Sequence, residues 1–243
     1  MSGDAKQVEF YNEKLAEIYD QIYHFKSYER DIAYLTDCVR RRLPDATSML
    51  DVACGTGNHA GGLSAVFKLE GLELSPAMLK RARAKHPGIT FHQGDMIDFD
   101  LQRNYDVVCC LFRTIAFVKT RDNFHSSIGA MGRHVRPGGL LLVEPFFTPE
   151  TYWTGNVKMN VVDESELKIA WMYVSEREGD LGIMNNHFLV GRPSGVEHFT
   201  EVHKMGLFSP QDYKSAFADA DLELEYDQTG PGGIGFYIGR RRT

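Results

Sequence analysis

An acidic residue and two glycines, spaced as in a binding loop, stand together in Asp51-Val-Ala-Cys-Gly-Thr-Gly-Asn-His59. The apolar residues around Asp51 predict a short buried strand over residues 48–54. Gly55 and Gly57 allow the backbone to turn tightly against a ligand, and the residues after Asn58 can begin a helix. A strand, a glycine loop and a helix in this order predict a pocket for a nucleotide-like cofactor.

Two cofactors fit these glycines. With Ala60 they satisfy the dinucleotide fingerprint G-x-G-x-x-[GA], and the acidic Glu73 follows at about the expected distance. Asp51, four residues before Gly55, and Asp95, at the end of a third predicted strand, favour another cofactor. This set of acids and glycines resembles motif I and its companion motifs in class I S-adenosylmethionine (SAM) methyltransferases. The motif alone leaves the dinucleotide alternative open.

The resemblance implies a contact for each part of SAM. Glu73 can accept both ribose hydroxyls, and Asp95 can accept from the adenine amino group while Met96 packs on the ring. Tyr19 is expected to fold over the methionine end, and a backbone carbonyl at Leu111 to bind its ammonium. The full expected set is Tyr19, Asp51, Ala53, Gly55, Gly57, Glu73, Leu74, Met78, Asp95, Met96 and Leu111. The alternatives are a core contact for Tyr19 and solvated strand ends for Glu73 and Asp95.

Strand and helix signals alternate along the chain. Strands are expected over residues 48–54, 68–74, 89–95, 105–112, 140–144, 222–228 and 234–239, and helices over 8–23, 27–42, 76–86, 122–135 and 210–220. Ser75 and Ser209 are the expected N-caps of two of these helices, and Pro137-Gly-Gly139 predicts a turn before the fifth strand. The fold class is therefore α/β, a Rossmann-like doubly wound sheet that binds ligands at the carboxyl ends of its strands.

Residues 157–208 interrupt this alternation with three or four segments of strand-like periodicity, separated by turn signals. An antiparallel insertion is expected there. The expected organisation is an N-terminal helical lid (1–43), a SAM-binding core (44–150), the insertion (151–209) and the end of the core sheet (210–243).

Composition excludes several classes of protein. The 243 residues carry a net charge of -6, which argues against nucleic acid as a partner. The clusters Arg40-Arg-Arg42 and Arg240-Arg-Arg242 are expected to be a solvated helix end and tail. No apolar run approaches the ~20 residues of a membrane helix, and the four cysteines form no C-x-x-C pair. We therefore expect a cytoplasmic protein with no membrane association. The histidines show no metal-ligand spacing, so no metal is expected.

Further segments narrow the resemblance. They are Leu50-Asp-Val-Ala-Cys-Gly-Thr-Gly57, Gly71-Leu-Glu-Leu-Ser75, His92-Gln-Gly-Asp-Met96, Val143-Glu-Pro145, His198-Phe199, Val202-His203 and Gly230-Pro-Gly-Gly233. Together they resemble the small-molecule N-methyltransferases of antibiotic biosynthesis, in particular the nucleotide-linked aminodeoxysugar N,N-dimethyltransferases and the lincosamide-pathway N-methyltransferases. The resemblance spans essentially the whole chain. It implies SAM as methyl donor, S-adenosylhomocysteine as product, a small-molecule amine as acceptor, and a homo-oligomer formed through the insertion.

Three departures from the amino-sugar enzymes affect the expected substrate wall. A shorter segment, His24-Phe-Lys-Ser-Tyr28, follows the first helix; Phe112-Arg-Thr-Ile-Ala-Phe117 replaces a more polar run; and Phe146-Phe147 replaces a pair of tryptophans. These replacements make the predicted wall less polar. They favour a lincosamide-type prolyl amine, with a TDP-linked amino sugar as the alternative.

Methyl transfer from a sulfonium is an in-line displacement by a neutral nucleophile, so the residues sought are those that align an amine. By resemblance, Tyr11 is expected to orient the amine, while Phe117 shapes the pocket without acting as a base. The substrate-binding candidates are Phe10, Arg113, Phe146 and His203. A packed tyrosine and a satisfied histidine are the alternatives for Tyr11 and His203. O-methylation and a non-catalytic SAM-binding regulator also remain open, as does the number of methyl groups added.

Overall fold

A computed structural model describes residues 12–231, 233 and 235–243. Its larger sheet has seven strands in the order β10-β11-β5-β4-β1-β2-β3. The strands are β1 (Ser48–Val52), β2 (Lys68–Glu73), β3 (Thr90–Gln93), β4 (Tyr105–Cys110), β5 (Val135–Val143), β10 (Leu222–Asp227) and β11 (Phe236–Arg241). β1 to β5 run parallel, and β11 lies antiparallel to both β5 and β10. The predicted α/β class is confirmed.

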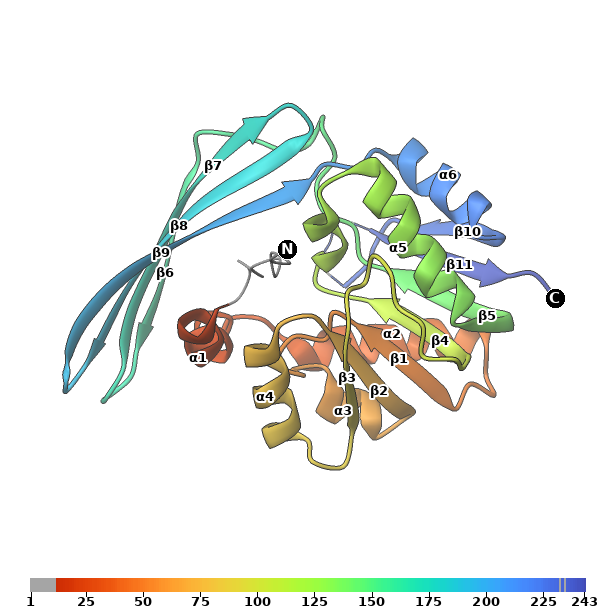
Figure 1. The fold of residues 1–243 in the computed structure, drawn as a ribbon, viewed down its shortest axis with the longest axis horizontal. Coiled ribbons are helices and arrows are strands. Elements are labelled where there is room, and N and C mark those ends of the chain that lie inside the picture. Colours follow the sequence, from red (N-terminus) through yellow and green to blue (C-terminus); the bar gives the residue numbers. More distant parts are fainter. Residues whose placement is uncertain (1–11, 232, 234) are drawn as a thin grey trace, which may run out of the picture.

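Helices cover both faces of this sheet (Figure 1). One layer comprises α2 (Tyr28–Arg42), α3 (Ala60–Ser64) and α4 (Pro76–Lys85), and the other comprises α5 (Arg121–Arg133) and α6 (Pro210–Asp219). Leu35 of α2 and Leu79 of α4 are buried in one apolar cluster with Met49 of β1. Phe124 of α5 is buried in a second cluster with Leu50 of β1. Alternate residues of the same strands thus anchor opposite helical layers, as a doubly wound sheet requires.

Local sequence signals placed several helix ends correctly. The Ser75 hydroxyl accepts a hydrogen bond from the backbone N–H of Met78, and Ser209 forms a reciprocal capping box with Asp212. Both helices also begin with proline, whose fixed φ suits the first helical position. These short-range interactions explain why the starts of α4 and α6 could be predicted.

Three local features differ from the sequence prediction. β1 ends at Val52 because Ala53 takes a left-handed conformation, with φ of 59°. The predicted turn at Pro137-Gly-Gly139 is wrong, because β5 begins at Val135 and the glycines form an irregularity inside the strand. A 3-10 helix, η1 (Thr114–Val118), follows β4 and was not predicted.

The insertion forms a separate four-stranded antiparallel sheet, in the order β6-β7-β8-β9, that projects from the core (Figure 1). Its strands are β6 (Val157–Asp163), β7 (Lys168–Glu178), β8 (Leu181–Arg192) and β9 (Gly195–Gly206). Helix α1 (Glu13–Ile22) buries Leu15 and Ile18 in a third apolar cluster with Trp171 and Phe188 of this sheet. Of the two expected lid helices, α1 therefore faces the insertion, whereas α2 belongs to the core layer.

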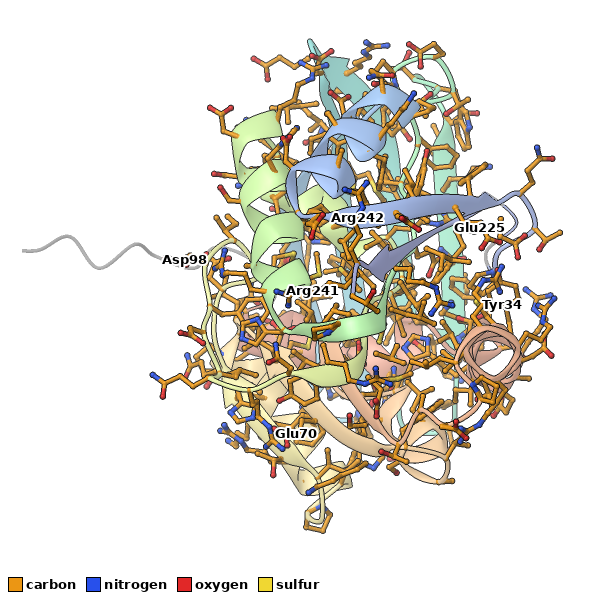
Figure 2. The ribbon with its side chains drawn as sticks, turned by 90° about the vertical axis from the view of Figure 1, so that its right-hand side faces the viewer. Tyr34, Glu70, Asp98, Glu225, Arg241 and Arg242 are labelled. Atoms are coloured by element: carbon orange, nitrogen blue, oxygen red, sulfur yellow. The ribbon has the colours of Figure 1, made fainter. Side chains whose placement is uncertain are left out.

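The arginines at the C-terminal end contact the core, so the expectation of a solvated tail there is wrong. Figure 2 shows Arg241 beside the end of α5, and its guanidinium donates to the carbonyl oxygens of Gly132, Arg133 and Val135. Arg240 donates to carbonyl oxygens of Gly138 and Arg42. These charged hydrogen bonds to backbone carbonyls fasten β11 to its neighbours. Among the described residues, no helix is both long and apolar enough to cross a membrane.

Candidate active site

A small cavity of about 30 Å³ lies beyond the carboxyl ends of β1 and β4. Its lining residues come from the glycine loop, from α1 and α2, and from the segment after β4. They are Tyr19, Tyr28, Asp51, Ala53, Cys54, Gly55, Thr56, Asn58, His59, Leu111, Phe112 and Thr114. The edge of the sheet predicted to bind a ligand therefore holds a small, partly open pocket, which we call the donor cavity.

Asp51 is the acidic residue buried in the wall of the donor cavity. Its side chain is 1% exposed, and its Oδ2 atom has no hydrogen-bond partner among the described residues. Burial raises the pKa of Asp51 to about 6. A buried carboxylate oxygen without a partner is costly unless a ligand satisfies it. An N–H or O–H donor on a bound cofactor would do so here.

The glycine loop approaches the donor cavity through left-handed residues. Ala53, Gly55 and Gly57 have φ of 59°, 59° and 76°. No atom lies within 4 Å of the position that a Cβ would take at Gly55, whereas a Cβ at Gly57 would stand 3.1 Å from His86 Cδ2. Gly55 therefore opens the backbone to a ligand, and Gly57 allows the loop to pack on α4.

Glu73 links the end of β2 to the same loop. Its carboxylate accepts from the backbone N–H groups of Gly55, at 3.0 Å, and Ser75, at 2.8 Å. Burial raises its pKa. Leu74 beside it is 37% exposed, and Met78 on the next helix is buried against Tyr19. Glu73, the residue predicted to bind the ribose, is thus held by two backbone hydrogen bonds next to the donor cavity.

The two residues expected to bind adenine lie apart from the donor cavity. The Asp95 carboxylate accepts from the backbone N–H of Ile97 at 3.0 Å, within its own loop. Met96 packs against the core cluster that contains Leu72. Neither residue lines the donor cavity, although both follow β3 at the carboxyl edge of the sheet.

A second cavity, of about 460 Å³, lies between α1, η1, the segment after β5 and the inner face of the antiparallel sheet. We call it the acceptor cavity. Four of the predicted substrate-pocket residues meet in its wall: Arg113, Phe117, Phe146 and His203. Phe10 and Tyr11 lie outside the described residues. The other lining residues are Tyr19, Tyr23, Phe25, Phe112, Thr114, Phe147, Tyr152, Trp153, Lys158, Met159, Asn160, Trp171, Tyr173, Ser175, Met184 and Met205.

Tyr19, Phe112 and Thr114 line both cavities. The two cavities therefore adjoin at these side chains, and we call this place the junction. Leu111, next to this junction, already uses its carbonyl oxygen to accept from the backbone N–H of Thr114, at 3.2 Å, and from its hydroxyl, at 2.8 Å.

Glu144, for which the sequence indicates no function, binds the backbone at the junction. Glu144 is 1% exposed, and its Oε2 accepts from the backbone N–H of Phe112 at 2.6 Å. Phe112 and Arg113 are consecutive left-handed residues, with φ of 54° and 63°. Burial raises the pKa of Glu144, while the positive charge of Lys26 opposes that shift. Its position after β5, at the ligand-binding edge, was the available signal.

A buried charge cluster, which the sequence pattern does not reveal, lies next to Phe112. Lys26 forms an ion pair with Asp31, and its ammonium lies 4.4 Å from the centre of the Phe112 ring. Asp31 in turn lies 3.3 Å from His59 Nε2. This cluster connects α2 to the glycine loop and to the segment after β4. Within the described parts of the chain, no group of three His, Cys, Asp or Glu side chains could hold a metal ion.

Comparison with known proteins identifies the family. A family model described as "Methyltransferase domain" matches residues 49–139. The dTDP-3-amino-3,4,6-trideoxy-alpha-D-glucopyranose N,N-dimethyltransferase of Streptomyces venezuelae is 40% identical over 228 residues, covering 92% of this chain and 96% of the relative. A second relative, the dTDP-3-amino-3,6-dideoxy-alpha-D-glucopyranose N,N-dimethyltransferase of Streptomyces fradiae, is 37% identical over 94% of this chain and 91% of its own.

A solved structure with bound cofactor agrees with this result. SAM-bound CalS10, an amino pentose methyltransferase from Micromonospora echinaspora involved in calicheamicin biosynthesis, superimposes with a TM-score of 0.85 at 36% identity, covering 92% of this chain and 96% of its own. Asp51 and Gly55 fit a bound cofactor, since Asp51 offers a buried oxygen acceptor and Gly55 leaves the backbone open at the carboxyl edge of the sheet. The chain belongs to the family of SAM-dependent N-methyltransferases that includes the dTDP-amino-sugar N,N-dimethyltransferases.

Proposed function

We propose that this enzyme transfers methyl groups from SAM to the amino group of a dTDP-linked amino sugar, and that it adds two of them. The observation that carries this proposal is the similarity along almost the whole chain, insertion included, to relatives with that activity. Of the two acceptors expected from the sequence, the comparisons favour this one. The lincosamide-type prolyl amine is the second candidate, favoured by the phenyl rings of Phe117 and Phe146 in the acceptor cavity.

The donor side of the reaction rests on residues of the core. When bound, SAM supplies a methyl group on a positively charged sulfur. Asp51 Oδ2 is placed to accept from the methionine end of the cofactor, and Glu73 from its ribose. Aromatic faces at Tyr19 and Phe112 suit a neighbouring cation. The contacts of Ala53, Leu74, Met78, Asp95, Met96 and Leu111 with the cofactor remain part of the same proposal.

The acceptor side aligns an amine and removes water from it. Alignment of two reactants can contribute ~7–11 kcal/mol to lowering a barrier. The acceptor cavity is lined mainly by aromatic rings, and such surroundings disfavour the charged ammonium relative to the neutral amine that attacks. Tyr11 is proposed to orient the amine, with Phe10 beside it, although both lie outside the described residues.

Two cations in the wall of the acceptor cavity suit a nucleotide-linked substrate. Arg113 and Lys158 both line this cavity. Each lies close to an aromatic ring: Arg113 at 5.7 Å from the centre of Phe147, and Lys158 at 5.0 Å from that of Trp153. A diphosphate bears negative charges that such groups bind, and the rings offer faces for a base.

We also propose that α1 and the insertion form the acceptor side, and that the outer face of the antiparallel sheet mediates homo-oligomerisation. That face exposes apolar side chains on all four strands, among them Val157, Met172, Leu189 and Val196. A reducing compartment such as the cytoplasm suits the four buried free thiols.

The test is turnover of purified protein with SAM and two acceptor pools, dTDP-linked amino sugars and free prolyl amines, read by mass spectrometry. Product from the first pool, with one and then two added methyl groups, supports the proposal. Product from the second pool alone would show that the acceptor is a prolyl amine and not a nucleotide-linked sugar. Absence of product from both rejects both acceptors.

A further inference from the structure

Two buried polar side chains, Glu201 and His203, share the inner face of β9. They stand two residues apart on the strand, with exposures of 7% and 5%. The intervening Val202 faces outward and is 50% exposed. The Glu201 Oε2 atom lies 3.2 Å from His203 Nε2. A carboxylate thus pairs with an imidazole on the apolar side of the insertion. There the loss of hydration costs free energy unless each polar group finds a hydrogen-bond partner.

His203 reaches the acceptor cavity. It lines that cavity beside Phe117, with ring centres 5.5 Å apart and planes at 76°. Among the described lining residues it is the one imidazole. The other titratable or charged side chains there are Tyr19, Tyr23, Arg113, Tyr152, Lys158 and Tyr173. Burial raises the pKa of Tyr23, Tyr152 and Tyr173, so these phenols hold their protons more tightly than usual. An imidazole is the side chain suited to accept a proton near neutral pH.

The backbone of Glu201 is fixed beside the imidazole by side-chain hydrogen bonds. Its backbone carbonyl accepts from the Asn186 side-chain amide at 3.2 Å, and Asn186 itself accepts from Trp171 Nε1 at 3.0 Å. The second carboxylate oxygen, Oε1, is buried without a hydrogen-bond partner among the described residues. The Oε2 atom therefore lies against the imidazole as the one oxygen of this carboxylate with a side-chain partner among the described residues.

We propose that His203 accepts the proton that the substrate ammonium loses before each methyl transfer, and that Glu201 positions the imidazole and stabilises its charged form. The ammonium N–H bond breaks, its electron pair stays on nitrogen, and the proton binds His203 Nδ1 while Nε2–H donates to Glu201. The neutral amine then attacks the methyl group, and the imidazolium releases its proton to solvent. After the first transfer the product is again an ammonium, so the same residue serves the second. The inference rests on the proposed amine methylation and names its proton acceptor.

The kinetic test uses His203→Gln and Glu201→Gln, with His198→Asn as control because His198 lies on the opposite, outer face of the same strand. With a dTDP-amino sugar, His203→Gln should lower kcat by roughly 10²–10⁴-fold with a smaller change in KM. His203→Gln should also abolish the acid limb of the pH profile, that is, the fall in kcat at low pH. Glu201→Gln should move this limb to lower pH. A limb that survives unchanged in His203→Gln would overturn the proposal, because the limb would then belong to the substrate amine.

A second measurement needs no acceptor and separates this inference from the proposed function. Histidine-ring NMR signals of the wild-type complex with S-adenosylhomocysteine are titrated with pH, with the His203 signal assigned by its loss in His203→Gln. If Glu201 and His203 act as the proposed dyad, this signal should titrate at lower pH in Glu201→Gln, because the imidazolium loses its anionic neighbour. Equal titration in both proteins would reject the dyad. Absence of methylated product from any amine would instead reject the proposed function.

Discussion

The carboxylate of Glu144 accepts a hydrogen bond from the backbone N–H of Phe112 at 2.6 Å. Glu144 follows β5 and Phe112 follows β4, so this bond joins adjacent strand ends at the point where the two cavities adjoin. Phe112 and Arg113 are both left-handed, a conformation that costs of order 1–3 kcal/mol at a residue other than glycine. The buried carboxylate offsets that cost and fixes the Phe112 ring at the junction.

Replacement of this carboxylate should therefore impair catalysis as well as stability. Glu144→Ala leaves the Phe112 N–H without its acceptor, at about 1–3 kcal/mol. We expect a lower Tm and a fall in kcat that exceeds any rise in the KM for SAM. Glu150→Ala, at an exposed position shortly after β5, is the control. Steady-state kinetics with a normal kcat would show that the junction does not need this bond.

Asp51→Asn should stabilise the folded protein and weaken the binding of the cofactor. Burial raises the pKa of Asp51 from 3.8 to about 6. The folded state therefore holds the proton more tightly than the unfolded state, and the carboxylate destabilises the fold progressively between these two values as pH rises. Above pH 6 this cost reaches up to about 3 kcal/mol, and below 3.8 it disappears.

The measurement is Tm with and without SAM at pH 4 and at pH 8. Asp51→Asn should exceed wild type in Tm at the higher pH alone, and its affinity for SAM by calorimetry should fall about tenfold or more. Asp45→Asn, an exposed neighbour before β1, should match wild type. Full SAM affinity in Asp51→Asn would remove Asp51 from the proposed donor site.

Lys26→Met should destabilise the folded protein, because it removes a buried positive charge next to the junction. The ammonium faces two buried carboxylates, Asp31 and Glu144, so its removal takes a positive neighbour from each, at up to about 3–5 kcal/mol. Asp31 keeps its contact with His59, and Glu144 keeps its hydrogen bond from Phe112. Lys14→Met is the matched control, since Lys14 pairs with Glu197 at the surface, where such pairs contribute ~0–1 kcal/mol. Denaturant unfolding curves measure both variants, and equal losses would contradict the assignment.

The same variant carries a pH prediction. Burial acts to raise the pKa of Asp31, but hydrogen bonds from His59 and Lys26 outweigh it and hold the pKa below 3.8. This carboxylate stabilises the fold above its unfolded value, and the contribution is lost as pH falls through the folded value. The difference in unfolding free energy between wild type and Lys26→Met should therefore narrow below about pH 4.

Lys158→Met tests whether the acceptor carries a diphosphate. Loss of one charged contact should raise the KM for a dTDP-amino sugar about tenfold, with little change in kcat. Lys168→Met, at an exposed lysine of β7, is the control. An unchanged KM for the nucleotide sugar would indicate that the diphosphate binds elsewhere.

Leu189→Glu tests the outer face of the antiparallel sheet. Leu189 is 49% exposed on β8, one of the two central strands. A charge there should dissociate an oligomer that buries this face, whereas Ala84→Glu on exposed α4 should leave it intact. Solution scattering at several concentrations gives the mass. Wild type that is already monomeric would reject the proposed oligomer.

The sequence predicted those parts of the fold that are determined locally. The hydroxyls of Ser75 and Ser209 cap their helices through contacts within four residues, and the alternation of the insertion strands follows from the pleat. The left-handed turn at Phe112 was not predictable in this way, because its acceptor, Glu144, is 32 residues distant. Likewise the register irregularity at Gly138 depends on pairing between β5 and β4.

The candidate site, like the fold, was predicted only where local sequence patterns determine it. Asp51, Gly55 and Glu73 meet because parallel strands end at one edge, which periodicity and spacing reveal. Glu201 was overlooked because an acidic residue within an amphipathic strand is ordinarily assigned to the solvent face. Its place on the inward face follows from the register of β9 against β8, where it pairs with Asn186.

The apolar cluster between α1 and the antiparallel sheet shares no buried residue with the two clusters that flank the core sheet. The insertion thus has an apolar cluster of its own, while α1 also packs on α4 of the core through Tyr19 and Met78. Residues of β6 to β9 line the acceptor cavity, and none of them lines the donor cavity. Such a division allows acceptor choice to diversify among homologues, or to be re-engineered by exchange of the insertion, while the donor is kept.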